Sequence, residues 1–239
     1  MTMKKPYALL LTFFFTLSLE AQYSWELGLT AGLASYQGDF TTTPVPGFKN
    51  SSFGLGVIGK YVFNYKWSVR PGVYFSSLKG DDFSSGDAWR ENIRRASFST
   101  ELTEISFIAE FEPFGEERYL GGRGFRKLVS PYFFAGIGLA IIKPEPDFSK
   151  TSGSADFLMK VGLDENAGKI KSHFVLPLGA GVKFDLSEWW NVSLEMGARA
   201  TFTDYLDGLS EAGNPDANDW YYFTGITVLR RLDGSMKIR

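Results

Sequence analysis

Apolar residues recur at every second position through most of the chain after residue 22, with small or polar residues between them. A period of two indicates β-strands with one apolar face, because successive side chains of a strand point to opposite sides. The pattern runs in segments of about ten residues separated by polar stretches. The sequence therefore predicts an all-β protein with strands near residues 23–34, 52–63, 67–77, 98–112, 131–142, 173–185, 190–203 and 219–230.

The links between the predicted strands alternate in length. Short links begin at Asn64 and Ser187, whereas the link at residues 115–130 is longer than a turn requires. An even number of antiparallel strands, with short periplasmic turns at one end and long extracellular loops at the other, is the plan of a bacterial outer-membrane barrel. The long links, at residues 35–51, 80–97, 143–172 and 204–218, all fall on the opposite side.

The residues on the second face of the predicted strands distinguish a membrane barrel from a soluble barrel. This face is rich in Gly and Ser and carries four acids and four bases. A soluble, lipocalin-like barrel, the alternative, would carry a denser charge on its outer face. Sparse, balanced charges favour a narrow lumen filled by ion pairs. We therefore predict an eight-stranded antiparallel transmembrane β-barrel of outer-membrane type. The predicted lumen charge network is Glu26, Lys60, Arg70, Glu104, Glu110, Lys183, Glu195 and Arg199.

The first segment is typical of an exported protein. Lys4 and Lys5 precede an uncharged stretch that ends at Leu19 and is followed by the small residue Ala21. The stretch is too short for a comfortable spanning helix, so we expect residues 1–21 to be a cleaved signal peptide. Residues 22–239 would then form the barrel, with a short periplasmic tail from Arg230, and the expected location is the bacterial outer membrane, in contact with its lipids.

Composition narrows the possible chemistry. The chain has no Cys and one His, which excludes thiolate catalysis and leaves almost nothing for a transition-metal site. The formal net charge of −2 gives no basic excess for nucleic-acid binding. We therefore expect no cofactor, no small-molecule substrate and no nucleic-acid partner.

Two motifs invite a catalytic interpretation. Gly54, Gly56 and Gly59 match the dinucleotide-binding pattern G-x-G-x-x-G, but they lie inside a predicted strand with no strand-to-helix turn around them. Ser172 and His173, with acids elsewhere, suggest a hydrolase such as a lipid A deacylase, although a triad is recognised by geometry. A solvated or interfacial His at a strand end is the alternative, and the expectation is that the protein is not an enzyme.

Charged clusters in the links suggest further contacts. Carboxylates at Asp204, Asp207, Asp216 and Asp219 could chelate calcium, or could act as loop formers. The segment from Trp89 to Arg95 could contact anionic lipopolysaccharide or a partner, or be a solvated loop. Since barrel closure does not require a turn as long as residues 115–130, we predict a periplasmic partner contact there, formed by Glu116, Glu117, Arg118, Arg123, Arg126 and Lys127.

Four stretches carry a family resemblance. They are Glu26-Leu-Gly28 through Gly32 to Tyr36-Gln-Gly38-Asp39, PYFFAGIG from Pro131, PLGAGVKFDLSEWWNVSLEMGARATFTDYLD from Pro177, and NDWYYFTGI from Asn218. In this order, over most of the mature chain, they resemble the PorG-type outer-membrane barrels of the type IX secretion system. The resemblance implies a component of the secretion and gliding machinery. It also implies association with periplasmic ring proteins of the PorK and PorN type, which are a ring lipoprotein and a ring protein.

Two other functions remain open at this stage. An OmpA-like structural or surface-binding barrel would use its extracellular loops to bind a host or matrix component. A lipid-modifying enzyme would depend on Ser172 or His173. A pore is disfavoured, because eight strands enclose little more than their own side chains.

Overall fold

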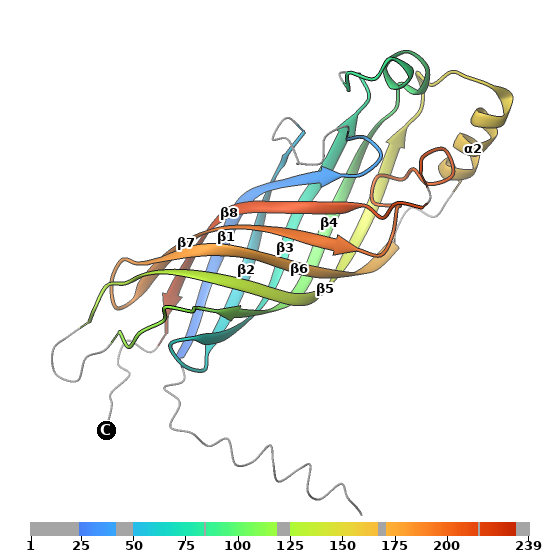
Figure 1. Cartoon of the computed structure of the whole chain (residues 1–239). Coiled ribbons are helices and arrows are strands. Elements are labelled where there is room, and N and C mark those ends of the chain that lie inside the picture. Colours follow the sequence, from blue (N-terminus) through green and yellow to red (C-terminus); the bar gives the residue numbers. More distant parts are fainter. Residues whose placement is uncertain are drawn as a thin grey trace, which may run out of the picture.

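A computed structural model describes residues 24–41, 50–83, 85–118, 125–166, 171–214 and 216–232. The predicted signal peptide, Arg123 and the end of the chain from residue 233 lie outside these residues. Eight antiparallel strands close into a barrel in which each strand pairs with the next and the last pairs with the first (Figure 1). They are β1 (Ser24–Gln37), β2 (Ser52–Val62), β3 (Trp67–Asp81), β4 (Ser97–Phe111), β5 (Val129–Asp147), β6 (Lys171–Asp185), β7 (Trp190–Thr201) and β8 (Trp220–Arg231).

The ends of the barrel differ. The β2–β3, β4–β5 and β6–β7 connections lie at one end, here named the turn end. The other four connections form the loop end, where the π-helical turn η1 (Arg90–Arg94) and the helix α2 (Ala155–Glu165) lie beyond the strands (Figure 1). No helix of the described chain is long and apolar enough to cross a bilayer.

All eight predicted strands are present, but several extend further than predicted at the loop end. β3 continues to Asp81 and β5 to Asp147, whose backbone pairs with Ser97 of β4. The outward side chains there are polar, with Lys143 forming ion pairs with Glu101 and Glu145. The hydrophobic alternation therefore stops at the edge of the apolar band, whereas the hydrogen-bonded ladder continues past it.

The polarity of the barrel is opposite to that of a soluble protein. Outward side chains in the middle of the strands are apolar and exposed, as in Leu29 and Phe107, each 62% exposed. Inward side chains include Glu104 and Glu110, each 1% exposed. This arrangement of apolar residues outside and polar residues inside is that of a barrel that spans a bilayer. It confirms the predicted outer-membrane fold and excludes the lipocalin-like arrangement.

The lumen is filled in two layers. Next to the turn end lies the turn half, in which charged side chains from seven strands meet. Towards the loop end lies the loop half, an apolar core closed by residues of the long loops, among them Phe40, Phe148, Leu206 and Leu209. The sequence predicted the first layer and not the second.

Glycines in the lumen make room for aromatic rings. A β-carbon at Gly179 or Gly197 would lie 2.6 Å from the tip of the Phe134 ring, and one at Gly54 would lie 2.0 Å from the Tyr74 hydroxyl. A β-carbon does not approach other heavy atoms so closely, and these positions therefore require glycine. Gly54 and Gly56 belong to β2, in agreement with a packing role for the G-x-G-x-x-G sequence.

Candidate functional site

Glu110 lies at the centre of the turn half. Its carboxylate binds the Lys60 ammonium and lies 3.2 Å from the Arg70 guanidinium. Arg70 also binds Glu195 at 2.8 Å, and the Tyr132 hydroxyl donates to the same carboxylate at 3.0 Å. Each charge thus has an opposite charge within contact distance, which offsets the cost of burying it.

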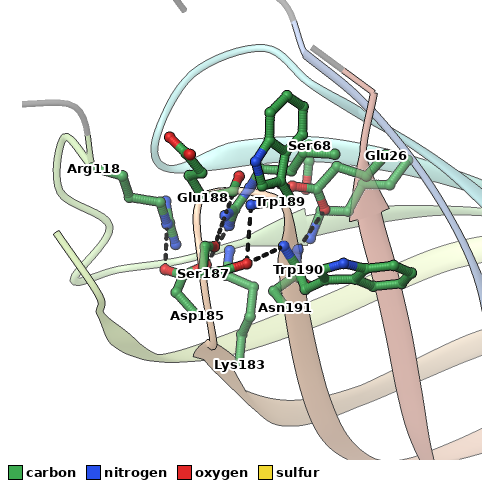
Figure 2. Close-up of polar contacts among 12 residues, drawn as sticks. Glu26, Ser68, Arg118, Lys183, Asp185, Ser187, Glu188, Trp189, Trp190 and Asn191 are labelled. Carbon is green, nitrogen blue, oxygen red and sulfur yellow. Dashed lines mark hydrogen bonds and ion pairs between the residues drawn. The ribbon is translucent and has the colours of Figure 1, made fainter. Parts of the chain in front are cut away.

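A second group of charges closes the mouth of the barrel at the turn end (Figure 2). Arg118, from the β4–β5 connection, donates to Asp185 at 2.6 Å and to Glu112 at 2.9 Å. The Lys183 ammonium binds Glu112, and Arg231 of β8 binds Asp185. Both carboxylates therefore have two cations each, and the connection is fixed to the barrel interior through Arg118.

The strand that closes the barrel joins the same network. Arg231 donates to Glu26 of β1 at 3.0 Å, and the Asn191 amide donates to Glu26 at 3.1 Å (Figure 2). A separate pair lies nearest the loop half, where Arg199 and the Tyr221 hydroxyl bind Glu104 at 3.3 Å and 2.7 Å. The β1–β8 seam is thus held by an ion pair as well as by its backbone ladder.

The structure brings all eight residues of the predicted lumen network into the interior, each less than 7% exposed. Four further residues complete it: Glu112, Arg118, Asp185 and Arg231. Together they make six carboxylates and six cations. Glu112 and Asp185 could have been found by continuing the alternation two residues beyond Glu110 and Lys183, whereas Arg118 comes from a connection that has no periodic signal.

Side chains leave little free space among these charges. A cavity of about 30 Å³ lies between Arg70, Tyr74, Glu104 and Arg199. A volume of this size holds about one water molecule. The side chains of this part of the lumen are therefore closely packed.

The residues of the predicted partner contact fall into a buried group and an exposed group. Arg118 points inward and its side chain is 10% exposed, so the expectation that it faces a partner does not fit its position. Its guanidinium is attracted by two buried carboxylates instead. Glu116 and Arg126 form an exposed ion pair, Lys127 is exposed and Glu117 is half-buried. Arg123 lies outside the described residues.

The Ser172 and His173 hypothesis fails on geometry. As neighbours in β6 their side chains point to opposite faces of the sheet. Ser172 is exposed on the outer face, whereas His173 is half-buried and its Nε2 atom has no hydrogen-bond partner among the described residues. A serine and histidine on opposite faces of a barrel wall cannot share a proton.

The four loop aspartates are not gathered around one point in the described residues. Asp216 is exposed, Asp204 accepts from the Ser210 hydroxyl at 3.0 Å, and Asp207 and Asp219 are buried together. In the part of the chain that the structure describes, no three acidic or His side chains are placed to hold a metal ion. Near η1, the Trp89 ring packs against Phe157 of the loop end and is 46% exposed.

Several solved structures are similar to this chain. Ail of Yersinia pestis, in complex with the heparin analogue sucrose octasulfate, is 13% identical, with a TM-score of 0.43 over 88% of this chain and 97% of that one. Neisserial surface protein A is 12% identical, with a TM-score of 0.46 over 86% and 96%. A major outer membrane protein of Thermus thermophilus is 13% identical, with a TM-score of 0.46 over 88% and 99%.

At these identities the likeness concerns the barrel and not its function. No significant match was found among curated protein sequences. A family model, in contrast, matches nearly the whole chain, over residues 4–234. The protein therefore belongs to the family described as a domain of unknown function, DUF6089.

Proposed function

We propose that the protein is a non-catalytic outer-membrane component of the type IX secretion and gliding machinery, which anchors or stabilises periplasmic ring proteins of the PorK and PorN type. The proposal rests on the resemblance of its sequence to PorG-type barrels. The structural feature that carries it is the β4–β5 connection, residues 112–128, at the turn end.

The root of this connection is held firmly. Glu112 and Arg118 enter the buried charge network, and the Arg126 backbone N–H donates to the Arg118 carbonyl at 2.8 Å. Exposed groups lie beside this root, among them Phe114, which is 72% exposed, and Lys127. A fixed root with both an apolar and a charged side chain exposed beside it suits the docking of a protein partner.

Co-purification from detergent-solubilised outer membranes tests the proposal. The tagged protein is expected to recover the periplasmic ring lipoprotein and ring protein in stoichiometric amounts, identified by mass spectrometry. Charge reversal by Arg126→Glu with Lys127→Glu is expected to reduce this recovery at least about tenfold, since it repels an acidic partner surface.

A matched control reverses the same number of charges at the opposite end of the barrel. Lys150→Glu with Lys160→Glu changes exposed lysines of the loop end and should leave recovery of the ring proteins unchanged. Equal recovery by all three proteins would remove the β4–β5 connection from the contact. A barrel that purifies without ring proteins would overturn the proposed function itself.

One observation favours a second candidate, an OmpA-like barrel that binds a surface component through its loops. Leu158, Met159 and Leu163 form an exposed apolar face of α2, between 43% and 62% exposed. The triple substitution of these residues by Ser should abolish adhesion to host cells or matrix and leave secretion intact if this candidate is correct. Unchanged adhesion would exclude α2 as the binding surface.

A further inference from the structure

Two carboxylates at the loop end share one tyrosine hydroxyl. The Tyr36 oxygen, at the end of β1, lies 2.6 Å from Asp207 Oδ2 and 2.7 Å from Asp219 Oδ1. Asp207 belongs to the β7–β8 connection, Asp219 precedes β8, and the two residues are 0% and 2% exposed. The group therefore joins the first strand to the last loop inside a buried site.

Counting protons shows what these contacts require. A tyrosine hydroxyl has one hydrogen and can donate it to one carboxylate. Its oxygen already accepts from the Asp39 backbone N–H at 2.8 Å and has one further acceptor position. The second short contact is satisfied when the other carboxyl is protonated and donates to Tyr36. Two ionised carboxylates at these distances would leave one buried contact repulsive.

The remaining oxygens of the pair hold the β7–β8 connection in place. Asp207 Oδ1 accepts from the Leu209 N–H at 2.8 Å, and Asp219 Oδ2 accepts from the Leu206 N–H at 2.9 Å. Leu206 and Leu209 are both fully buried in the apolar core of the loop half. The carboxyl pair thus fixes the two side chains that close the lumen at this end.

Close packing leaves no room for a substitute group. A β-carbon at Gly38 would lie 1.9 Å from Asp219 Oδ1 and 2.0 Å from the Tyr36 hydroxyl. Gly38 therefore brings the backbone directly against the pair, which excludes a cation or a larger ligand from that side. A proton is the species that fits.

Charges on the surrounding elements favour the protonated form. Asp39 and Asp204 are nearby acids and raise the pKa of Asp219. Arg94, from the β3–β4 connection, donates to the Asp39 carbonyl at 2.8 Å, but its charge is bound by Asp82. The other facing acid, Asp164 of α2, accepts backbone N–H groups of residues 210–212.

Burial and these neighbours act in the same direction. Burial, with Asp39 and Asp204, raises the pKa of Asp219 to about 7, and burial with Asp219 raises the pKa of Asp207 well above its ordinary value; the hydrogen bonds from Tyr36 and from backbone N–H groups lower both pKa values but are outweighed. An exposed aspartate has a pKa near 3.9. Because the closed state binds the proton more tightly than an open one, raising the pH above about 4 favours opening until the closed pair also ionises.

We propose that Tyr36, Asp207 and Asp219 form a proton-dependent latch that holds the β7–β8 connection over the loop end of the barrel. With one proton on the carboxyl pair the latch is closed. Loss of that proton places two adjacent negative charges in the interior and releases the connection, which exposes Leu206 and Leu209 at the loop end. The latch acts independently of any contact at the turn end.

Hydrogen exchange of the full-length protein in lipid nanodiscs tests the latch. Protection factors of the amides in residues 204–219 are expected to fall on the order of tenfold to a hundredfold between pH 5 and pH 8. Asp207→Asn and Asp219→Asn each replace an acid by a neutral group that can donate to Tyr36. Either variant should remove most of the pH dependence and remain protected at pH 8.

Asp216→Asn is the matched control, since it removes an exposed carboxylate from the same connection. It should keep the pH dependence of the unsubstituted protein. Equal protection at both pH values in the unsubstituted protein would overturn the proposal, as would a full pH response in both Asn variants.

An infrared measurement on the unsubstituted protein does not depend on how a variant folds. At pH 6 exposed carboxyls are ionised, so a carbonyl band of a protonated carboxyl reports a buried acid. The band is expected at pH 6 and should disappear by pH 9. Its absence at pH 6 would show that the pair holds no proton and would overturn the latch.

Discussion

The turn half and the loop half of the lumen both bury carboxylates, but they stabilise them differently. In the turn half each carboxylate faces a Lys or Arg, as Glu110 faces Lys60 and Arg70. In the loop half Asp207 and Asp219 face a tyrosine hydroxyl and backbone N–H groups, within an apolar core. Opposite charges offset the burial of the first group, whereas in the proposed latch the second group shares one proton and responds to pH. Buried carboxyl groups can therefore hold a fixed position at one end and form a pH-dependent contact at the other.

The largest expected effect comes from removing the carboxylate at the centre of the turn half. Glu110→Leu leaves Lys60 buried without its ion-pair partner and should lower the free energy of unfolding by about 3–5 kcal/mol. Urea unfolding in lipid vesicles, followed by tryptophan fluorescence, measures it. Glu101→Gln removes an exposed carboxylate of the outer surface and should have no measurable effect. Similar losses for the two variants would contradict the importance of burial.

A smaller and more local effect is expected in the loop half. Leu209→Ala creates a cavity in the apolar core and should cost about 2–5 kcal/mol in the free energy of opening the β7–β8 connection. Hydrogen exchange should show the loss in residues 204–219 and leave the turn half protected. Leu163→Ala, at an exposed position of α2, is the control. Equal loss of protection in both halves would mean that they unfold as one unit.

The two halves should also have opposite responses to pH. Burial alone would raise the pKa of Glu112, but the charges of Lys183, Lys60 and Arg118 outweigh it and lower the pKa to about 2. A lowered pKa adds stability above the unfolded value, near 4.5, and the gain is lost as the pH falls towards 2. This contribution is roughly 3 kcal/mol. Glu112→Gln should reduce the loss of stability between about pH 4.5 and pH 2 by this amount, and an unchanged loss would show that Glu112 does not contribute to it.

The barrel could be predicted from the sequence because its signal is repeated in every strand. Alternation in β1, β4 and β6 gave the strand, its two faces and the inward position of residues such as Glu26, Glu104 and Lys183. Beyond the strands the apolar and polar residues no longer alternate, and the inward positions there could not be predicted. Arg118 and Leu209 lie in connections, and their inward positions depend on how the chain folds back over the barrel mouth.

The apolar layer of the lumen was missed for a related physical reason. Inward residues at the loop end, such as Leu78, Leu102 and Ile142, are apolar on the face that is otherwise polar. Towards the loop end of these strands the outward residues become polar while the inward ones become apolar, so the period of two no longer identifies which side is inside. The Tyr36 contact with Asp207 and Asp219 joins residues more than 170 positions apart, and no local pattern reports such a contact.

The ion pair between Arg231 and Glu26 has a consequence for assembly. It joins the final strand to the first, and Arg70 with Glu195 likewise joins β3 to β7. Such partners meet only after the sheet has curled into a complete ring, because their separation along the chain is long. Until then these charges remain in water, which disfavours premature entry of a partly built sheet into the bilayer. Ring closure and charge neutralisation are therefore one cooperative event, and the electrostatics of the lumen select complete barrels over unfinished ones.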